Sequence, residues 1–136
     1  MAFRPYLFFG GNCREAFTRY QEIFGGNLEL MAMGDVPDSD APPEQADMII
    51  HAALMFEDHL LMASDDPMDG NFGPVQGMKV SYSAPDAAAA RRVFDALAEG
   101  GQVTQELIET FFSPAFGMCT DKFGTPWMVV ADMPAA

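Results

Sequence analysis

The chain has 136 residues, the length of one domain that can bury a full hydrophobic core. Its net charge of −13 argues against nucleic-acid binding, because phosphate contacts require clustered Lys and Arg. No apolar run reaches the roughly 20 residues of a membrane span, and the N-terminus lacks the apolar segment of a signal peptide. Cys13 and Cys119 form neither a disulfide framework nor a metal-binding spacing, so we expect free thiols in a cytoplasmic protein.

The first elements along the chain are predicted to be a strand, a helix and a second strand. The apolar run Pro5–Phe9 predicts the first strand. Asn12 is a suitable N-cap and Glu15 stands where a capping box places its acid, so a helix is expected to begin here. A Gly-Gly pair at 25–26 ends this helix, and Leu28–Met33 again has strand character.

Two further strands complete this first unit. They are Met48–Phe56 and His59–Ala63, which are close enough in sequence to form a hairpin. The segment Gly34–Asp47 is rich in Asp, Pro, Glu and Ser and predicts an exposed loop. Asp65–Gly77 is interpreted as an acidic linker; its start resembles a calcium loop, but Gln76 stands at the position of the bidentate Glu.

The second half of the chain repeats the same order of elements. Asp86 is the expected N-cap of a helix that a second Gly-Gly pair, at 100–101, ends. The strands expected around this helix are Met78–Ser83, Val103–Phe112, Phe116–Thr120 and Trp127–Ala131. The sequence therefore predicts one α+β domain over residues 1–136, built from two β-α-β-β-β units at about 3–64 and 78–132.

Two stretches carry a family resemblance that covers nearly the whole chain. The first is Pro5–Ala16 with the later Phe24-Gly25-Gly26, and the second is Glu109–Trp127, with its Thr-Asp-Lys-Phe-Gly turn. They resemble the PhnB-like branch of the vicinal oxygen chelate superfamily, the glyoxalase, bleomycin-resistance and dioxygenase group. This branch often carries the label 3-demethylubiquinone 3-methyltransferase. The resemblance implies an eight-stranded cup formed by two halves, usually in a homodimer.

The resemblance also implies where a metal would bind in metal-using members, namely on the first and last strands of each unit. In this chain those positions fall at Pro5 or Tyr6, at Leu60, Met62 or Ser64, at Lys79 or Ser81, and near Met128. None of these side chains is a good ligand for a divalent metal, which prefers imidazole and carboxylate donors. We therefore expect no metal of the usual kind and no cofactor.

Two ionisable residues, His51 and Glu109, stand out within apolar strands. A lone His in such a strand is more often a hydrogen-bonded core residue than a ligand. Strict alternation would place Glu109 on one face of its strand with Val103, Gln105, Leu107 and Phe111. If both ionisable residues reach the cup, they could bind a polar ligand or move a proton; the alternative is a structural pair or a solvated Glu at the rim.

The function that follows is the binding of a small, partly apolar molecule in a cup lined by Phe8, His51, Glu109, Phe111 and Trp127. Aromatic residues such as Phe111 and Trp127 are more often core residues than ligand contacts. Whether the protein is an enzyme stays open. The alternative is a metal-dependent isomerase, lyase or dioxygenase that uses His51 and Glu109. A methyltransferase rests on the family label alone, since the chain has no Gly-x-Gly-x-x-Gly nucleotide loop.

Overall fold

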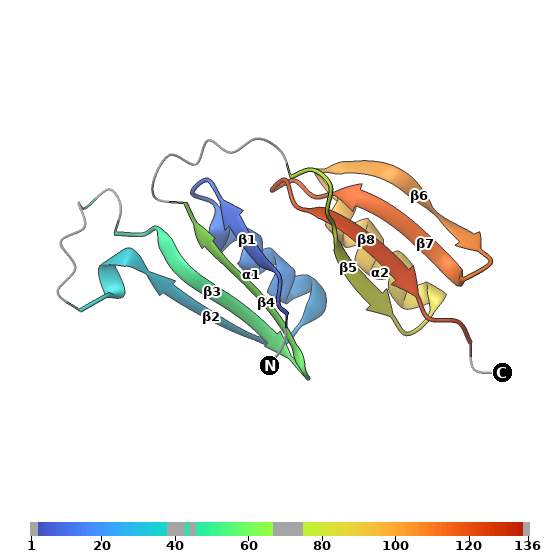
Figure 1. Cartoon of the computed structure of the whole chain (residues 1–136), viewed down its shortest axis with the longest axis horizontal. Coiled ribbons are helices and arrows are strands. Elements are labelled where there is room, and N and C mark those ends of the chain that lie inside the picture. Colours follow the sequence, from blue (N-terminus) through green and yellow to red (C-terminus); the bar gives the residue numbers. More distant parts are fainter. Residues whose placement is uncertain (1–2, 38–42, 44–45, 67–74, 135–136) are drawn as a thin grey trace. The chain divides into compact units, whose positions relative to one another are not determined.

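The computed structural model describes residues 3–37, 43, 46–66 and 75–134, and the chain divides into two compact units, 1–72 and 73–136. Each unit has one helix packed against a four-stranded sheet, as Figure 1 shows for α1 and for α2. The predicted α+β class and the β-α-β-β-β order of both units are confirmed. Residues 38–42 and 44–45 of the predicted loop, and residues 67–74 of the predicted linker, lie outside the described residues. Asp65, where the linker and its calcium-like segment were predicted to start, is instead the last residue of β4 (His59–Asp65).

The two sheets have the same strand order. In the first sheet the order is β1-β4-β3-β2, and in the second it is β5-β8-β7-β6; the pairs β1–β4 and β5–β8 are parallel and the others are antiparallel. The first unit consists of β1 (Tyr6–Phe9), α1 (Cys13–Phe24), β2 (Asn27–Ala32), a short 3-10 turn (Met33–Asp35), β3 (Ile49–Phe56) and β4 (His59–Asp65). The second consists of β5 (Val80–Ala84), α2 (Ala87–Ala98), β6 (Gln102–Thr110), β7 (Ser113–Thr120) and β8 (Pro126–Ala131). None of the described helices is both long and apolar enough to cross a membrane.

Alternation along β1 separates the two faces of the first sheet. Phe9 packs edge-on against Phe17 of α1, with ring centroids 6.1 Å apart, so Leu7 and Phe9 point toward the helix. Tyr6 and Phe8 therefore point to the opposite side, which we call the open face of the first sheet. Their exposed fractions of 39% and 57% agree with this assignment, because Leu7 and Phe9 are buried.

The second sheet has the same two faces. A Cβ on Gly117 would approach the ring of Phe94 in α2, so Gly117 lies against the helix. The buried residues of β7 alternate with half-buried ones, and Phe116 and Met118 therefore face away from α2. We call this side the open face of the second sheet.

The Gly-Gly pairs have the same two roles in both units. Gly25 and Gly100 end their helices with φ of 80° and 76°, a left-handed conformation that favours glycine. A Cβ on Gly26 would lie 2.5 Å from the carbonyl oxygen of Met55, and a Cβ on Gly101 would collide with the carbonyl oxygen of Thr120. The first glycine of each pair thus reverses the chain, and the second lets the next strand begin close to its neighbour.

The two helices start in different ways. The Asp86 carboxylate accepts the N–H of Ala89 at 2.8 Å, so the predicted cap of α2 is confirmed. The predicted capping by Asn12 is wrong, because the Asn12 side chain makes no cap hydrogen bond. Asp65, at the end of β4, supplies the acceptor instead: its Oδ1 accepts the N–H groups of Gly11 and Cys13, both at 3.0 Å.

Candidate functional site

An aromatic cluster on the open face of the first sheet contains two of the predicted site residues. Phe8 and His51 both contact Tyr6, whose ring centroid lies 5.3 Å from that of Phe8 and 6.0 Å from that of His51. The Tyr6 hydroxyl lies 3.4 Å from His51 Nδ1, so the phenol leans across β4 toward β3. Tyr6 therefore connects Phe8 with His51, although the sequence indicated Tyr6 only as a metal-ligand position.

A row of side chains crosses this open face from one edge of the sheet to the other. Tyr6 pairs with Met62, Met62 pairs with Ala53, and Ala53 pairs with Glu29 on the edge strand β2. Directly paired residues point to the same side of a sheet, so all four belong to the open face. Their chemistry changes along the row from an aromatic ring through a thioether and a methyl group to a carboxylate.

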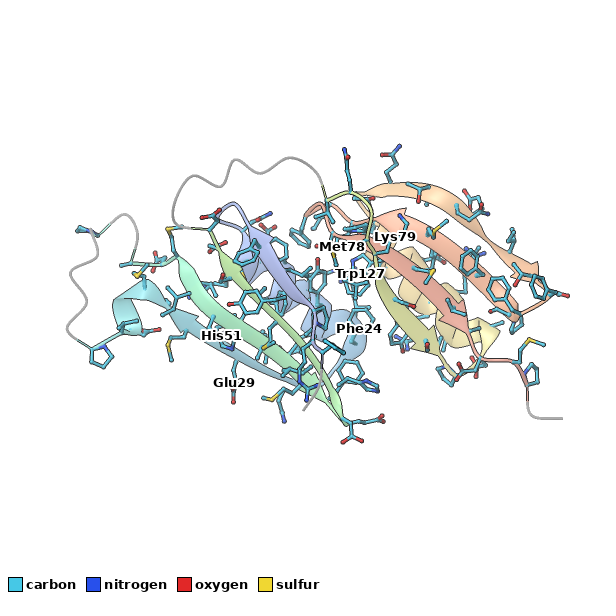
Figure 2. The ribbon with its side chains drawn as sticks, viewed as in Figure 1. Phe24, Glu29, His51, Met78, Lys79 and Trp127 are labelled. Atoms are coloured by element: carbon cyan, nitrogen blue, oxygen red, sulfur yellow. The ribbon has the colours of Figure 1, made fainter. Side chains whose placement is uncertain are left out.

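His51 stands beside this row. It pairs directly with Met31 on β2, and Glu29, two residues before Met31, is its diagonal neighbour on the same face. Figure 2 labels His51 and Glu29 on these adjacent strands. Met31 is 50% exposed, while His51 is half-buried. The open face thus combines a polar His–Glu neighbourhood with exposed aromatic and thioether surface.

The positions at which the family resemblance implies metal ligands are occupied by poor donors. In the first unit Tyr6 pairs with Met62, and in the second unit Ser81 pairs with Met128, at the corresponding place of β5 and β8. Phenol, hydroxyl and thioether groups are weak ligands for Zn²⁺, Mn²⁺ or Fe²⁺ compared with imidazole and carboxylate. The side chains at these positions therefore do not fit a divalent metal.

Glu109 lies on β6, in the second unit, and its strand is not regular. Val103 pairs with Cys119, whereas Gln105 pairs with Met118, so two residues that alternation would place together point to opposite faces. The expectation of one shared face is wrong because register shifts interrupt β6 at several places. Ile108 pairs with Phe116 and lies on the open face, and the register shifts again between Ile108 and Thr110. Glu109 lies at this shift and is exposed, so alternation does not assign it to a shared face.

Phe111 lies in the turn between β6 and β7 rather than in a strand. The predicted strand to Phe112 ends two residues early, at Thr110, because the Thr110 hydroxyl accepts the N–H groups of Phe112 and Ser113 and closes a turn. Phe111 is 93% exposed and touches Phe112, whose ring in turn contacts Phe116 at 5.2 Å.

Trp127 belongs to the helix side of the second sheet. It pairs with Cys119 on the buried face of β7 and is 2% exposed. Its indole N–H donates to Asp121 Oδ2 at 2.8 Å, and the N–H groups of Phe123 and Thr125 donate to Asp121 Oδ1. This burial supports the core role of Trp127, and the family motif around it is a turn organised by one carboxylate.

Both cysteines are free thiols, as expected, and the structure shows that both are buried. Each is 0% exposed. Burial raises the pKa of Cys13 to about 12, with the Asp65 carboxylate adding to the effect, and raises the pKa of Cys119 to about 11, with Asp121 adding to it. A thiol of this kind is a poor nucleophile, because the thiolate is the reactive form.

We expect neither thiol of the folded protein to react with iodoacetamide at about pH 8, and both to react in urea. Because the folded pKa values lie above the unfolded value of 9.0, the thiols stabilise the fold fully below about pH 9. That contribution is lost as the pH rises through 11 and 12. Urea titrations at a series of pH values give the free energy of unfolding of the native chain and of a Cys13→Ala, Cys119→Ala variant. Above about pH 9, the free energy of unfolding of the native chain should fall more steeply with pH than that of the variant. Equal slopes would contradict this expectation.

Sequence reasoning missed Tyr6 as a partner of His51, and it missed Glu29. Alternation along the run Pro5–Phe9 could have placed Tyr6 with Phe8, but the pairing partner of β1 was not readable from sequence. Glu29 gave no signal, since a lone acid in an edge strand is common on solvated surfaces.

Comparison with known proteins places the chain among relatives of the same length. Residues 1–130 match the model of the family described as 3-demethylubiquinone-9 3-methyltransferase. Protein YjdN of Escherichia coli strain K12 is 33% identical over 141 aligned positions, which cover 95% of this chain and 94% of that protein. The crystal structure of PA1353 from Pseudomonas aeruginosa is 42% identical with a TM-score of 0.86, covering 98% and 99% of the two chains.

Two other solved structures share the fold at lower identity. The PhnB protein of Bacillus cereus is 24% identical with a TM-score of 0.78, covering 96% of this chain and 99% of that one. The fosfomycin resistance protein FosX of Listeria monocytogenes is 7% identical with a TM-score of 0.67, covering 98% and 94%. These likenesses confirm the predicted glyoxalase-type fold, and the sequence match shows that the chain belongs to the family described as 3-demethylubiquinone-9 3-methyltransferase.

Proposed function

We propose that this protein binds a small, partly apolar molecule on the open face of its first sheet. The observation that carries the proposal is the cluster of Tyr6, Phe8 and His51, in which two rings are 39% and 57% exposed on a face that α1 does not cover. Ligand sites combine apolar and aromatic surface with a few polar groups, and this face has both. Phe8 and His51 are the predicted site residues on which the proposal rests most directly.

The proposed binding does not use a metal ion. The pairs Tyr6–Met62 and Ser81–Met128 supply no suitable donors at the positions that metal-using relatives employ. Within the described residues, no group of three or more His, Cys, Asp or Glu side chains is arranged to hold a metal. The alternative of a metal-dependent isomerase, lyase or dioxygenase using His51 and Glu109 lacks a comparable observation in its favour, and so does a methyltransferase.

We further propose a homodimer in the cytoplasm as the working form of the protein. The family resemblance supports the dimer, and light scattering at low protein concentration would test it. The two buried free thiols suit a reducing compartment.

The binding proposal can be tested with 4-phenylbutanol as a neutral probe and with methionine methyl groups as reporters. In protein labelled with [methyl-¹³C]methionine, we expect the probe to shift the NMR signals of Met31 and Met62 and to leave the signal of Met133, 57% exposed after β8, unchanged. Phe8→Ala should weaken binding roughly fivefold to tenfold, because it removes a ring contact worth about 1 kcal/mol.

Phe111→Ala is the matched control, since Phe111 is also an exposed ring but lies in the other unit. An unchanged affinity in this variant would confine the site to the first sheet, whereas an equal loss would favour the wider cup that includes Phe111. Absence of shifts at Met31 and Met62 with this probe and its charged analogues would contradict the proposal. Elemental analysis showing stoichiometric zinc, manganese or iron would contradict metal independence.

A further inference from the structure

The strands of the first sheet carry charge of only one sign on the open face. None of the four strands contains a Lys or Arg, and Glu29 is the acidic residue that the register places on this face. Among the described residues of the first unit, the cationic side chains are Arg4, before β1, and Arg14 and Arg19, on the helix that covers the other face. The whole chain carries a net charge of −13.

This charge distribution selects against anions. A carboxylate or phosphonate ligand beside Glu29 would be repelled by that carboxylate and would find no Lys or Arg on the strands to pair with. An ammonium group, in contrast, would find the Glu29 carboxylate as an exposed partner.

The arrangement of the row also separates the polar end of the site from its apolar end. Glu29 is on β2 at one edge, and Tyr6 is on β1 at the other edge, with Met62 and Ala53 between them. Adjacent strands are about 4.8 Å apart, so the ends of the row are separated by roughly 14 Å at the backbone. The side chain of Tyr6 extends toward His51, so its phenol lies nearer to Glu29 than the backbone separation suggests.

We infer that the molecule bound on this face is an apolar amine, whose ammonium group pairs with Glu29 and whose apolar body lies on Met62, Tyr6 and Phe8. This inference rests on the proposed function, because it specifies the charge and shape of the ligand of the same site. The amine end of the ligand lies over β2, and its hydrocarbon or aromatic end lies over β1. His51 lies between them, next to both Tyr6 and Glu29, where it can accept or donate a hydrogen bond to a polar group of the ligand.

Three probes with one skeleton test the inference: 4-phenylbutylamine, 4-phenylbutanol and 4-phenylbutyrate. Titrations followed at the Met31 and Met62 methyl signals should rank the amine tightest and the carboxylate weakest. Glu29→Gln should weaken the amine about fivefold, as expected for an exposed ion pair, and should leave the alcohol unchanged. Glu22→Gln, the same charge change on α1, should alter neither affinity, and about 0.5 M salt should weaken the amine alone.

The outcomes separate this inference from the proposed function. If the alcohol shifts Met31 and Met62 but Glu29→Gln leaves the amine affinity unchanged, or if the carboxylate binds as tightly as the amine, the inference fails and the binding face survives. If none of the three probes shifts these methyl signals, the proposed function fails as well. Glu29 is exposed, so its variant should fold, and the dispersion of the same spectra checks this directly.

Discussion

Replacing Asp121 with alanine is expected to lower the free energy of unfolding by roughly 3–5 kcal/mol. The Asp121 carboxylate is 5% exposed and accepts N–H groups from Phe123, Thr125 and Trp127 at 2.8–3.0 Å. Removing it takes the acceptor from three donors in the turn that connects β7 to β8. Urea denaturation followed by far-UV circular dichroism measures the loss.

Two milder variants separate the contributions of the individual hydrogen bonds to the stability of this turn. Trp127→Phe removes the indole N–H bond and part of the buried ring, but it leaves the two backbone donors of Phe123 and Thr125 with their acceptor. Asp121→Asn keeps one carbonyl oxygen, so it should cost less than alanine. If Asp121→Ala lowered stability by less than about 1 kcal/mol, this account of the turn would be wrong.

Asp65→Ala is expected to have an effect of similar size, roughly 3–5 kcal/mol. Asp65 is 3% exposed and accepts the N–H groups of Gly11 and Cys13 with one oxygen and that of Ile49, at 2.9 Å, with the other. One carboxylate therefore joins β4 to β3 and to the N-terminus of α1, where a negative charge also interacts favourably with the helix dipole. The same urea titration measures this loss.

The two helix starts provide matched controls for Asp65. Asp86→Ala removes one exposed capping bond from α2 and should cost about 1 kcal/mol. Asn12→Ala should cost only a few tenths of a kcal/mol, because the Asn12 side chain makes no cap bond. A larger loss from Asn12→Ala than from Asp65→Ala would restore the capping box that the sequence suggested.

The repeated order of elements was predictable because its signals are local. Helix spacing, the Asp86 cap and the Gly-Gly pairs each depend on residues close together in sequence, and both sheets formed as those signals indicated. The end of β6 was missed because a threonine hydroxyl closes the turn at Phe111 and Phe112, where no glycine, asparagine or proline marks it.

The candidate site was predictable only in part, because its contacts join residues far apart in the chain. His51 was noticeable as a lone imidazole, but its neighbour Tyr6 depends on the parallel pairing of β1 with β4. Asp65 was placed in a linker because acids before Pro and Gly usually indicate one; its three donors come from other elements. The register shifts that interrupt β6 on both sides of Ile108, one of them at Glu109, leave no mark in the sequence.

The two units have the same architecture, but only the first ends its parallel strand pair with a buried carboxylate. In the first unit the last pair of the β1–β4 ladder is Phe9 with Asp65, and in the second unit the equivalent pair is Ala84 with Ala131. α2 carries its own cap in Asp86 and has no need of an acid at Ala131. Replacing β8 with the sequence of β4 would therefore bury a charged carboxylate without its hydrogen-bond donors. The two units have the same fold, but their last strands are not exchangeable.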